Sequence, residues 1–265
     1  MNGRDVIPSQ FDASGAFETC RVKAGRVVRL NDHLERLRAS LQTLGIGDWD
    51  ERAVRSELAK AARGIRAGYV RAAVRRGAWC GFLLPQPVRR EGAPRLLIHR
   101  HAGVPYPAGQ IRRGVSIRTV ASRWPASETG WAQVKSSDRL GSVLARAEAG
   151  ECAEALRIGR HGFLTEGTVS NLSLVRSGTL VTPPGWLGVL EGVTRHRVLE
   201  AARRLRLSAQ IEPVTRHDLF NAEEAFLTNV LMEILPIREV DGRRIGTRVP
   251  GSVTRRLMRA VMGER

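Results

Sequence analysis

The sequence predicts an α+β protein built from two lobes, and three observations lead to that prediction. Residues 1–120 alternate strand patterns with two amphipathic helix patterns. Residues 121–131 combine serine, proline, glycine and threonine without apolar periodicity, which is typical of a linker. Residues 132–265 again mix short strands with helices. We therefore expect a small N-terminal lobe at 1–120, a linker at 121–131 and a C-terminal lobe at 132–265.

The length and composition support a folded protein with an ample core. The chain has 265 residues, of which 42% are hydrophobic and 26% charged. No apolar run is long enough to span a bilayer, and the first residues lack the pattern of a signal peptide, so we expect a cytoplasmic protein without membrane attachment. The three cysteines lack C-x-x-C spacing, which argues against a disulfide framework and against a metal site.

The net charge of +17 is the unusual feature of the composition. A nucleic-acid partner would fit such a charge if the basic residues were clustered and interleaved with aromatic residues. Instead they are spread along the chain in pairs such as Arg75-Arg76 and Arg203-Arg204. This spread argues against nucleic-acid binding and favours an arginine-rich surface that attracts small anionic substrates.

In the first lobe, strand patterns alternate with two helix patterns. Leu34, Leu37 and Leu41 have helical spacing, and Asn31 or Asp32 is a suitable N-cap for that helix. A second helix follows at 51–63. The expected strands lie at 16–22, 27–30, 69–75, 77–84, 96–99 and 115–120.

In the second lobe, the strands are short and the helix starts are marked by small residues. Asp241-Gly242 is a hairpin turn signal, and Ser252 is a suitable N-cap for the last helix. The expected helices lie at 140–149, 192–205 and 252–262, the strands at 154–158, 172–175, 180–182 and 225–228, and a hairpin at 237–245.

The first candidate for chemistry is a lysine. Only three of the 43 basic residues are lysines, namely Lys23, Lys60 and Lys135. A guanidinium stays protonated, whereas a desolvated ammonium can lose its proton and react with an aldehyde. The alternative is that Lys135 is an ordinary surface lysine.

Three further stretches carry groups that could bind a cofactor. Glu166 lies in a run of small and hydroxyl residues at 162–171, which is otherwise a surface loop. The helix start at Gly192, Val193 and Thr194 offers free amides to a phosphate, although ordinary helix starts look similar. The strand end at 228–230 offers amides to a ligand or is a plain turn. Together these features indicate a cofactor with an aldehyde, a basic ring and a phosphate, which describes pyridoxal phosphate.

The order and spacing of these motifs resemble the class IV aminotransferase family of pyridoxal-phosphate enzymes. The resemblance covers nearly the whole chain. It rests on Phe17-Glu18-Thr19, His33-Leu34-Glu35-Arg36-Leu37, Tyr69-Val70-Arg71, Lys135, Thr165-Glu166-Gly167, Ser170-Asn171, Gly192-Val193-Thr194-Arg195, Glu223-Glu224-Ala225-Phe226 and Pro236.

The resemblance implies a small α/β sandwich lobe and a larger barrel-like lobe, with the cofactor in the cleft between them and two copies in a homodimer. It implies that Lys135 binds the aldehyde of the cofactor and later transfers the α-proton of the substrate. It also implies that Glu166 pairs with the ring nitrogen of the cofactor. It implies a substrate that is a small amino compound, with Arg71 as the candidate for its carboxylate. The residues implied for the phosphate and its surroundings are Arg36, Gly192, Val193, Thr194, Asn229 and Val230.

Within the family, the motifs favour a reaction like that of aminodeoxychorismate lyase, which releases 4-aminobenzoate and pyruvate. Branched-chain enzymes place a tyrosine where this chain has Leu140 and a Gly-Thr pair where it has Asn229-Val230. Asp138, however, departs from the asparagine of the lyases. The carboxylate trap of D-amino-acid aminotransferases is absent after Arg76-Gly77. An amino-acid transaminase of the D-amino-acid or branched-chain type is the alternative.

The opening segment departs from the family as well. Residues 1–14 are too short for the longer first strand and the Asp-Arg-Gly segment that usually precede Phe-Glu-Thr. Together with the net charge, this departure leaves a second alternative, which is a non-catalytic family member.

Overall fold

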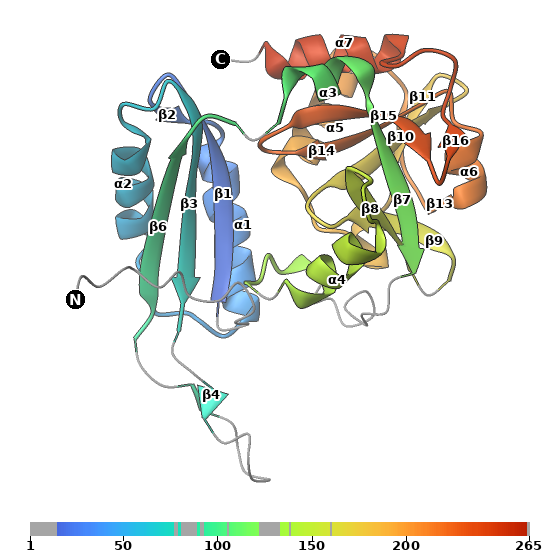
Figure 1. The fold of residues 1–265 in the computed structure, drawn as a ribbon. Coiled ribbons are helices and arrows are strands. Elements are labelled where there is room, and N and C mark those ends of the chain that lie inside the picture. Colours follow the sequence, from blue (N-terminus) through green and yellow to red (C-terminus); the bar gives the residue numbers. More distant parts are fainter. Residues whose placement is uncertain are drawn as a thin grey trace. The chain divides into compact units, whose positions relative to one another are not determined.

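The computed structural model describes residues 15–76, 79–80, 89–90, 93–104, 106–121, 133–137, 139–159 and 161–263. Its contacts divide the chain into two units (Figure 1). Unit 1 consists of Met1–Ala102 with Val134–Leu140, and unit 2 of Gly103–Gln133 with Gly141–Arg265. Both units combine helices with a β-sheet, which confirms the predicted α+β class.

The unit boundaries differ from the expected lobes. β7 (Val115–Ala121) hydrogen-bonds to β8 (Glu154–Ile158) and β15 (Glu233–Val240), so it belongs to unit 2 although we expected it in the first lobe. Conversely, the segment around Lys135 pairs with the first strand and belongs to unit 1. Pairing between residues distant in sequence decided both assignments. The expected linker at 121–131 lies outside the described residues, apart from Ala121.

Unit 1 contains a four-stranded antiparallel sheet in the order β2-β1-β3-β6. Buried and half-buried residues alternate along β3, and Val70, Ala72 and Val74 point into the core. The strands are β1 (Gly15–Lys23), β2 (Arg26–Val27), β3 (Ala67–Arg75) and β6 (Arg95–Ala102), and a hairpin of β4 (Trp79–Cys80) and β5 (Arg89–Arg90) lies between β3 and β6 in sequence.

Helices α1 (Leu30–Thr43) and α2 (Glu51–Ala62) cover one face of this sheet (Figure 1). Leu34 and Leu37 are buried there, as their spacing predicted. The predicted N-cap of α1 is wrong, because Arg29 occupies that position with a φ of 55°. Asp32 instead accepts a 2.6 Å hydrogen bond from Arg29 Nε within the first turn.

Unit 2 is built on a six-stranded barrel in the order β10-β14-β15-β7-β8-β9, closed by pairing of Asn171 with Glu166. Its interior holds a continuous apolar cluster that includes Leu156, Leu172 and Leu227. The remaining barrel strands are β9 (Phe163–Gly167), β10 (Asn171–Arg176) and β14 (Glu224–Asn229). The outer strands are β11 (Thr179–Thr182), β12 (Ala209–Ile211), β13 (Val214–Thr215) and β16 (Arg243–Arg244).

The helices of unit 2 are α3 (Ala108–Arg113), α4 (Leu140–Glu148), α5 (Val193–Arg204), α6 (Arg216–Phe220) and α7 (Ser252–Met262), with a 3-10 turn at Gly185–Leu187. Gly251, and not the predicted Ser252, is the N-cap of α7. The Glu224 carboxylate takes over the capping role, since it accepts hydrogen bonds of 2.9 and 2.7 Å from the amides of Val253 and Thr254.

Several short elements carry no periodic signal and were not predicted, among them α3, α6 and β9. The expected turn at Asp241-Gly242 is present, and both residues have positive φ. Residues 1–14, Asp138 and most of the expected strand at 77–84 lie outside the described residues. In the part of the chain that the structure describes, no helix is long and apolar enough to cross a membrane.

Candidate active site

The segment that carries Lys135 is bound to the start of β1 in unit 1. The Phe17 amide donates a 3.1 Å hydrogen bond to the Lys135 carbonyl, and the Ser137 amide donates a 3.0 Å hydrogen bond to the Gly15 carbonyl. The Lys135 amide donates to Ser40 Oγ on α1 at 3.2 Å. These three bonds fix the backbone of the lysine although the segment forms no regular element.

Lys135 and Arg71 share one aromatic ring. Lys135 Nζ and Arg71 Cζ each lie 4.9 Å from the centroid of the Phe17 ring. A cation at this distance from a ring is attracted by the π-electrons, which orders both long side chains. Burial lowers the pKa of Arg71, opposed by the charge interaction with Tyr69. The structure thus brings together the predicted lysine and the predicted carboxylate-binding arginine.

Arg36 is held by a buried carboxylate. Its Nε and Nη2 donate hydrogen bonds of 2.7 and 2.8 Å to the two oxygens of Glu18, and His33 Nδ1 lies 2.7 Å from Glu18 Oε2. Burial raises the pKa of Glu18, but the charge of Arg36 and the hydrogen bonds from His33 and Arg36 outweigh it and lower this pKa to about 2. The guanidinium is therefore fixed in orientation by an ionised partner.

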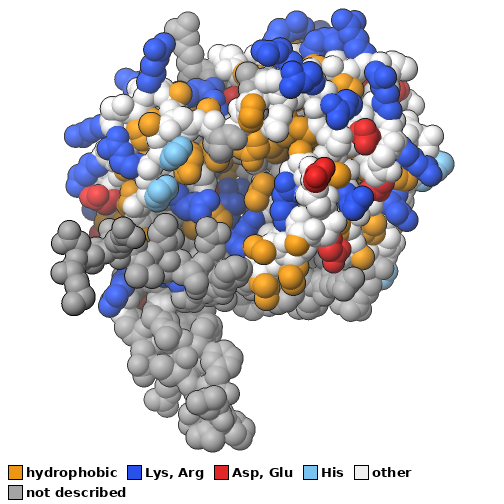
Figure 2. All heavy atoms as spheres, viewed as in Figure 1, with side chains coloured by type: hydrophobic (Ala, Val, Ile, Leu, Met, Phe, Trp, Pro, Cys, Tyr) orange, Lys and Arg blue, Asp and Glu red, His pale blue; other side chains and the backbone are white. Residues whose placement is uncertain are grey.

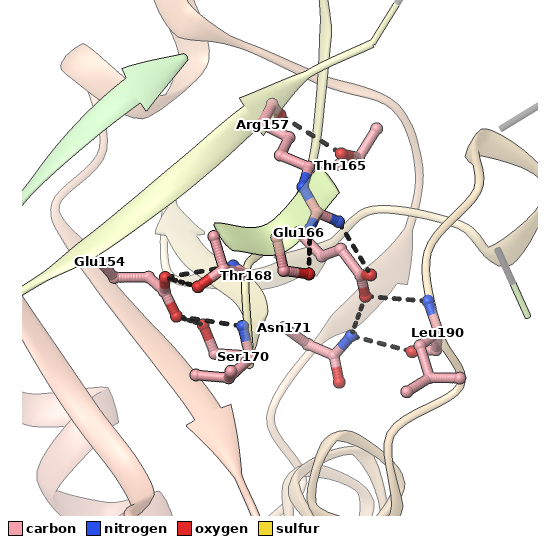
Figure 3. Close-up of polar contacts among 10 residues, drawn as sticks. Glu154, Arg157, Thr165, Glu166, Thr168, Ser170, Asn171 and Leu190 are labelled. Carbon is pink, nitrogen blue, oxygen red and sulfur yellow. Dashed lines mark hydrogen bonds and ion pairs between the residues drawn. The ribbon is translucent and has the colours of Figure 1, made fainter. Parts of the chain in front are cut away.

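In unit 2, the Glu166 carboxylate is held at the end of β9 (Figure 3). Its Oε2 accepts hydrogen bonds of 3.2 Å from Asn171 Nδ2 and 2.9 Å from the Leu190 amide. The same Asn171 nitrogen donates to the Leu190 carbonyl at 2.8 Å. Arg157 Nη1 lies 3.8 Å from the other oxygen. These groups fix the orientation of the carboxylate, and a carboxylate oxygen can accept a hydrogen bond from a protonated ring nitrogen.

A second carboxylate organises the loop between β9 and β10. Glu154 is buried and accepts hydrogen bonds from the amides of Ala155, Thr168 and Val169, at 3.0, 3.1 and 3.3 Å (Figure 3). The hydroxyls of Thr168 and Ser170 add bonds of 2.5 and 2.9 Å. The loop that follows Glu166 is therefore rigidly attached to β8.

The start of α5 has the features of a phosphate site. Gly192 is the N-cap and has no side chain that could accept hydrogen bonds from the first helical amides. These N–H groups are therefore available to donate to a ligand such as a phosphate. Thr194 is 2% exposed, and its Oγ1 has no hydrogen-bond partner among the described residues. A buried hydroxyl without a partner is costly unless a ligand supplies one. The predicted phosphate site fits these residues.

Gly192 also needs to be a glycine. A Cβ at this position would lie 2.0 Å from Asn171 Oδ1, so the backbone of the helix start lies directly against the residue that holds Glu166. Glu166 and the helix start are thus joined through Asn171.

Asn229 and Val230 lie where β14 turns into β15. Asn229 Oδ1 accepts hydrogen bonds of 2.9 Å from the amides of Leu231 and Met232, and its Nδ2 donates to Tyr106 Oη and to the Val169 carbonyl at 3.2 Å. The Asn229 side chain therefore stabilises the turn between β14 and β15. The adjacent Thr228 Oγ1 is buried without a partner in the described structure, so it offers a second hydroxyl to a ligand.

Sequence analysis missed the residues that support the predicted ones. Glu18, His33 and Asn171 occur in the motifs but received no role, and Glu154 was not singled out. Each acts through a partner that the fold brings into contact with it, such as Arg36 for Glu18 and Thr168 for Glu154. The available signal was the run of small residues around Gly167, where a Cβ would lie 2.2 Å from Ser170 Oγ.

Substitution of Gly192 by alanine tests the link between the helix start and Glu166. We expect a loss of stability of about 1–3 kcal/mol from overpacking, together with weaker binding of pyridoxal phosphate because Asn171 must move. Urea unfolding and a spectroscopic titration of the apoprotein with the cofactor measure the two effects. Gly47→Ala is the control, since a Cβ there meets nothing within 4 Å. Equal cofactor affinity in both variants would contradict the assignment of this helix start to the cofactor site.

The chain has two α+β units, a lysine whose backbone is fixed, a hydrogen-bonded carboxylate suited to a basic nitrogen, and a helix start whose amides have no side-chain cap. Together these features define an enzyme of the pyridoxal-phosphate type. The comparisons identify the family: a model described as amino-transferase class IV matches residues 15–240. The chain belongs to this family of pyridoxal-phosphate-dependent enzymes, which confirms the resemblance seen in the motifs.

Relatives with different reactions match nearly the whole chain. A Methanocaldococcus jannaschii protein, provisionally named a branched-chain-amino-acid aminotransferase, is 33% identical over 97% of this chain and 91% of its own. The D-alanine aminotransferase of Bacillus licheniformis is 29% identical over 93% and 86%. The crystal structure of 4-amino-4-deoxychorismate lyase from Pseudomonas aeruginosa is 32% identical, with a TM-score of 0.79 over 93% and 90%.

Proposed function

We propose that this protein transfers amino groups between an amino acid and a 2-oxo acid. The observation that carries the proposal is the 33% identity to the M. jannaschii protein over 97% of the chain, together with the likeness to a D-alanine aminotransferase. The sequence motifs alone favoured the lyase reaction. These two likenesses support amino transfer ahead of it.

The residues of the chain fit the steps of this chemistry. Pyridoxal phosphate, when bound, supplies an aldehyde and an electron-withdrawing ring. Lys135 is proposed to hold the aldehyde and then to move the α-proton of the substrate. Glu166 keeps the ring nitrogen protonated, and Arg71 binds a carboxylate. Arg36, the hydroxyl of Thr194 and the amides at Val193 and Thr194 are proposed to hold the phosphate.

The lyase reaction is the second candidate, and a specific observation favours it. The P. aeruginosa structure is 32% identical over 93% of this chain, and Asn229 followed by an apolar residue matches the motif expected of such lyases.

One pair of assays separates the candidates. We expect the purified protein to pass amino groups from L-leucine, D-alanine or L-glutamate to a 2-oxo acid, measured by chromatography of both products. Aminodeoxychorismate without an acceptor should release no pyruvate. Pyruvate release together with no amino transfer would replace the proposal by the lyase reaction. Inactivity in both assays without a visible absorption band would leave a non-catalytic family member.

A homodimer remains part of the proposal. Helix α4 exposes Leu140, Val143 and Leu144 at helical spacing, and Leu144 is 54% exposed. Such an exposed apolar stripe on a helix is typical of a protein interface. Sedimentation at several concentrations measures the state.

A further inference from the structure

Basic side chains are common on the surface of this protein. Figure 2 shows Lys and Arg side chains spread over the face in view, with few Asp and Glu side chains among them. Arg157 on β8 differs from such exposed residues, because its side chain is only 20% exposed. A largely buried guanidinium needs partners, so the groups around Arg157 indicate what its charge does.

An irregularity in the pairing of β8 and β9 brings Arg157 to Glu166. The register of the two strands shifts between two successive pairs, which are Leu156 with Gly167 and Ile158 with Leu164. Thr165 and Glu166 therefore both lie opposite Arg157. Such a bulge, with two residues against one, changes the direction in which side chains point. The Arg157 carbonyl also accepts a 3.3 Å hydrogen bond from Thr165 Oγ1.

The Arg157 guanidinium lies between a hydroxyl and a carboxylate. Its Nη2 donates a 2.7 Å hydrogen bond to Ser142 Oγ on α4, and its Nη1 lies 3.8 Å from Glu166 Oε1. Figure 3 shows this side chain reaching toward the Glu166 carboxylate. A separation of 3.8 Å is an ion pair without a hydrogen bond. Since Asn171 and the Leu190 amide already orient the carboxylate through its other oxygen, Arg157 contributes mainly positive charge.

We propose that Arg157 tunes the cofactor through Glu166, because its positive charge weakens the ion pair between this carboxylate and the protonated ring nitrogen of pyridoxal phosphate. The inference rests on the proposed function, in which Glu166 keeps that nitrogen protonated. A cation beside the same carboxylate offsets part of its negative charge and repels a second cation that binds there. A ring nitrogen that is less fully protonated withdraws electrons less strongly. Arg157 therefore limits the electron-withdrawing power of the cofactor.

The test compares two cofactors that differ only at the ring nitrogen. Pyridoxal phosphate and deazapyridoxal phosphate, in which a carbon replaces that nitrogen, carry the same aldehyde and phosphate. Spectroscopic titration of the full-length apoprotein gives both dissociation constants, and their ratio is the preference for the natural cofactor. In Arg157→Leu we expect this preference to rise by about tenfold, because a like charge beside the ring nitrogen is removed. Arg157→Gln, which keeps a donor for Ser142 without the charge, should show the same rise.

Three further variants separate the charge from the structure. Arg157→Lys keeps the positive charge and should stay within about twofold of the native preference. Arg176→Leu is the matched control on β10, since it removes an arginine that pairs with Glu212 and Asp218. It should leave the preference unchanged. In a Glu166→Gln background, Arg157→Leu should also leave it unchanged, because the charge acts through Glu166.

Failure of this inference and failure of the proposed function give different results. Suppose that Glu166→Gln lowers the preference for pyridoxal phosphate, whereas Arg157→Leu leaves it the same or lowers it. The tuning role of Arg157 would then be overturned and the role of Glu166 would stand. Weaker binding of both cofactors by the same factor in Arg157→Leu would likewise reduce Arg157 to a structural residue. A preference that Glu166→Gln does not change would overturn the proposed role of Glu166, and the inference with it.

Discussion

Replacing Lys135 with alanine is expected to lower kcat by at least about 10³-fold and to abolish the absorption band at the edge of the visible range. The physical reason is that the same amine is assigned both the covalent hold on the cofactor and the transfer of the α-proton, and a positioned base alone contributes 10²–10⁴-fold. Steady-state amino transfer and an absorption spectrum of the purified holoenzyme measure both effects.

Two controls make this prediction specific. Lys60 on α2 is 59% exposed and pairs with Glu57, so Lys60→Ala should leave kcat and the band unchanged. Lys135→Arg keeps the positive charge beside Phe17 but cannot react with an aldehyde, so it should behave like the alanine variant. Retention of the band in Lys135→Arg would show that another group holds the cofactor.

Replacing Glu18 with glutamine is expected to have the largest effect on stability. Glu18 is fully buried and is the shared partner of Arg36 and His33. Removal of its charge breaks the ion pair with Arg36, which costs roughly 3–5 kcal/mol for a buried pair. Urea unfolding at pH 7 measures the loss. Glu57→Gln, which breaks an exposed pair with Lys60, should cost less than about 1 kcal/mol.

The same substitution predicts a pH dependence. The pKa of Glu18 is about 2 in the folded protein, below its ordinary value of 4.5, so the ionised form stabilises the fold. This contribution is on the order of 3 kcal/mol, is complete above pH 4.5 and is lost as the pH falls towards 2. The stability difference between the native protein and Glu18→Gln should therefore shrink on acidification across this range. A difference that stays constant from pH 7 to pH 2 would exclude Glu18 as an ionised partner of Arg36.

These two substitutions also separate two kinds of role in unit 1. Lys135→Ala should change activity with little change in unfolding, because the lysine side chain is only half-buried. Glu18→Gln should change unfolding and, through the orientation of Arg36, the affinity for pyridoxal phosphate. A Glu18→Gln protein that binds the cofactor with unchanged affinity would limit Glu18 to a structural role.

The sequence by itself determined the elements with long periodic patterns and the chemical groups. Leucine spacing placed α1, alternation placed β3, and the scarcity of lysine drew attention to Lys135. The order of the motifs led to the family. These signals are local, since each depends on residues within about a dozen positions of one another. The motifs ranked the lyase reaction first because Leu140 and Asn229 depart from the branched-chain pattern, whereas full-length likeness supports amino transfer.

The tertiary structure decided what depends on pairing between distant segments. Only the strand register places Arg71 opposite His99, and only the packing of α1 on β1 gives Arg36 and His33 a common carboxylate in Glu18. Likewise, Val134–Leu140 joins unit 1 and β7 joins the barrel because backbone hydrogen bonds, not sequence neighbours, satisfy their amides. The sequence determines which chemical groups are present, whereas the fold determines which partners orient these groups and set their ionisation.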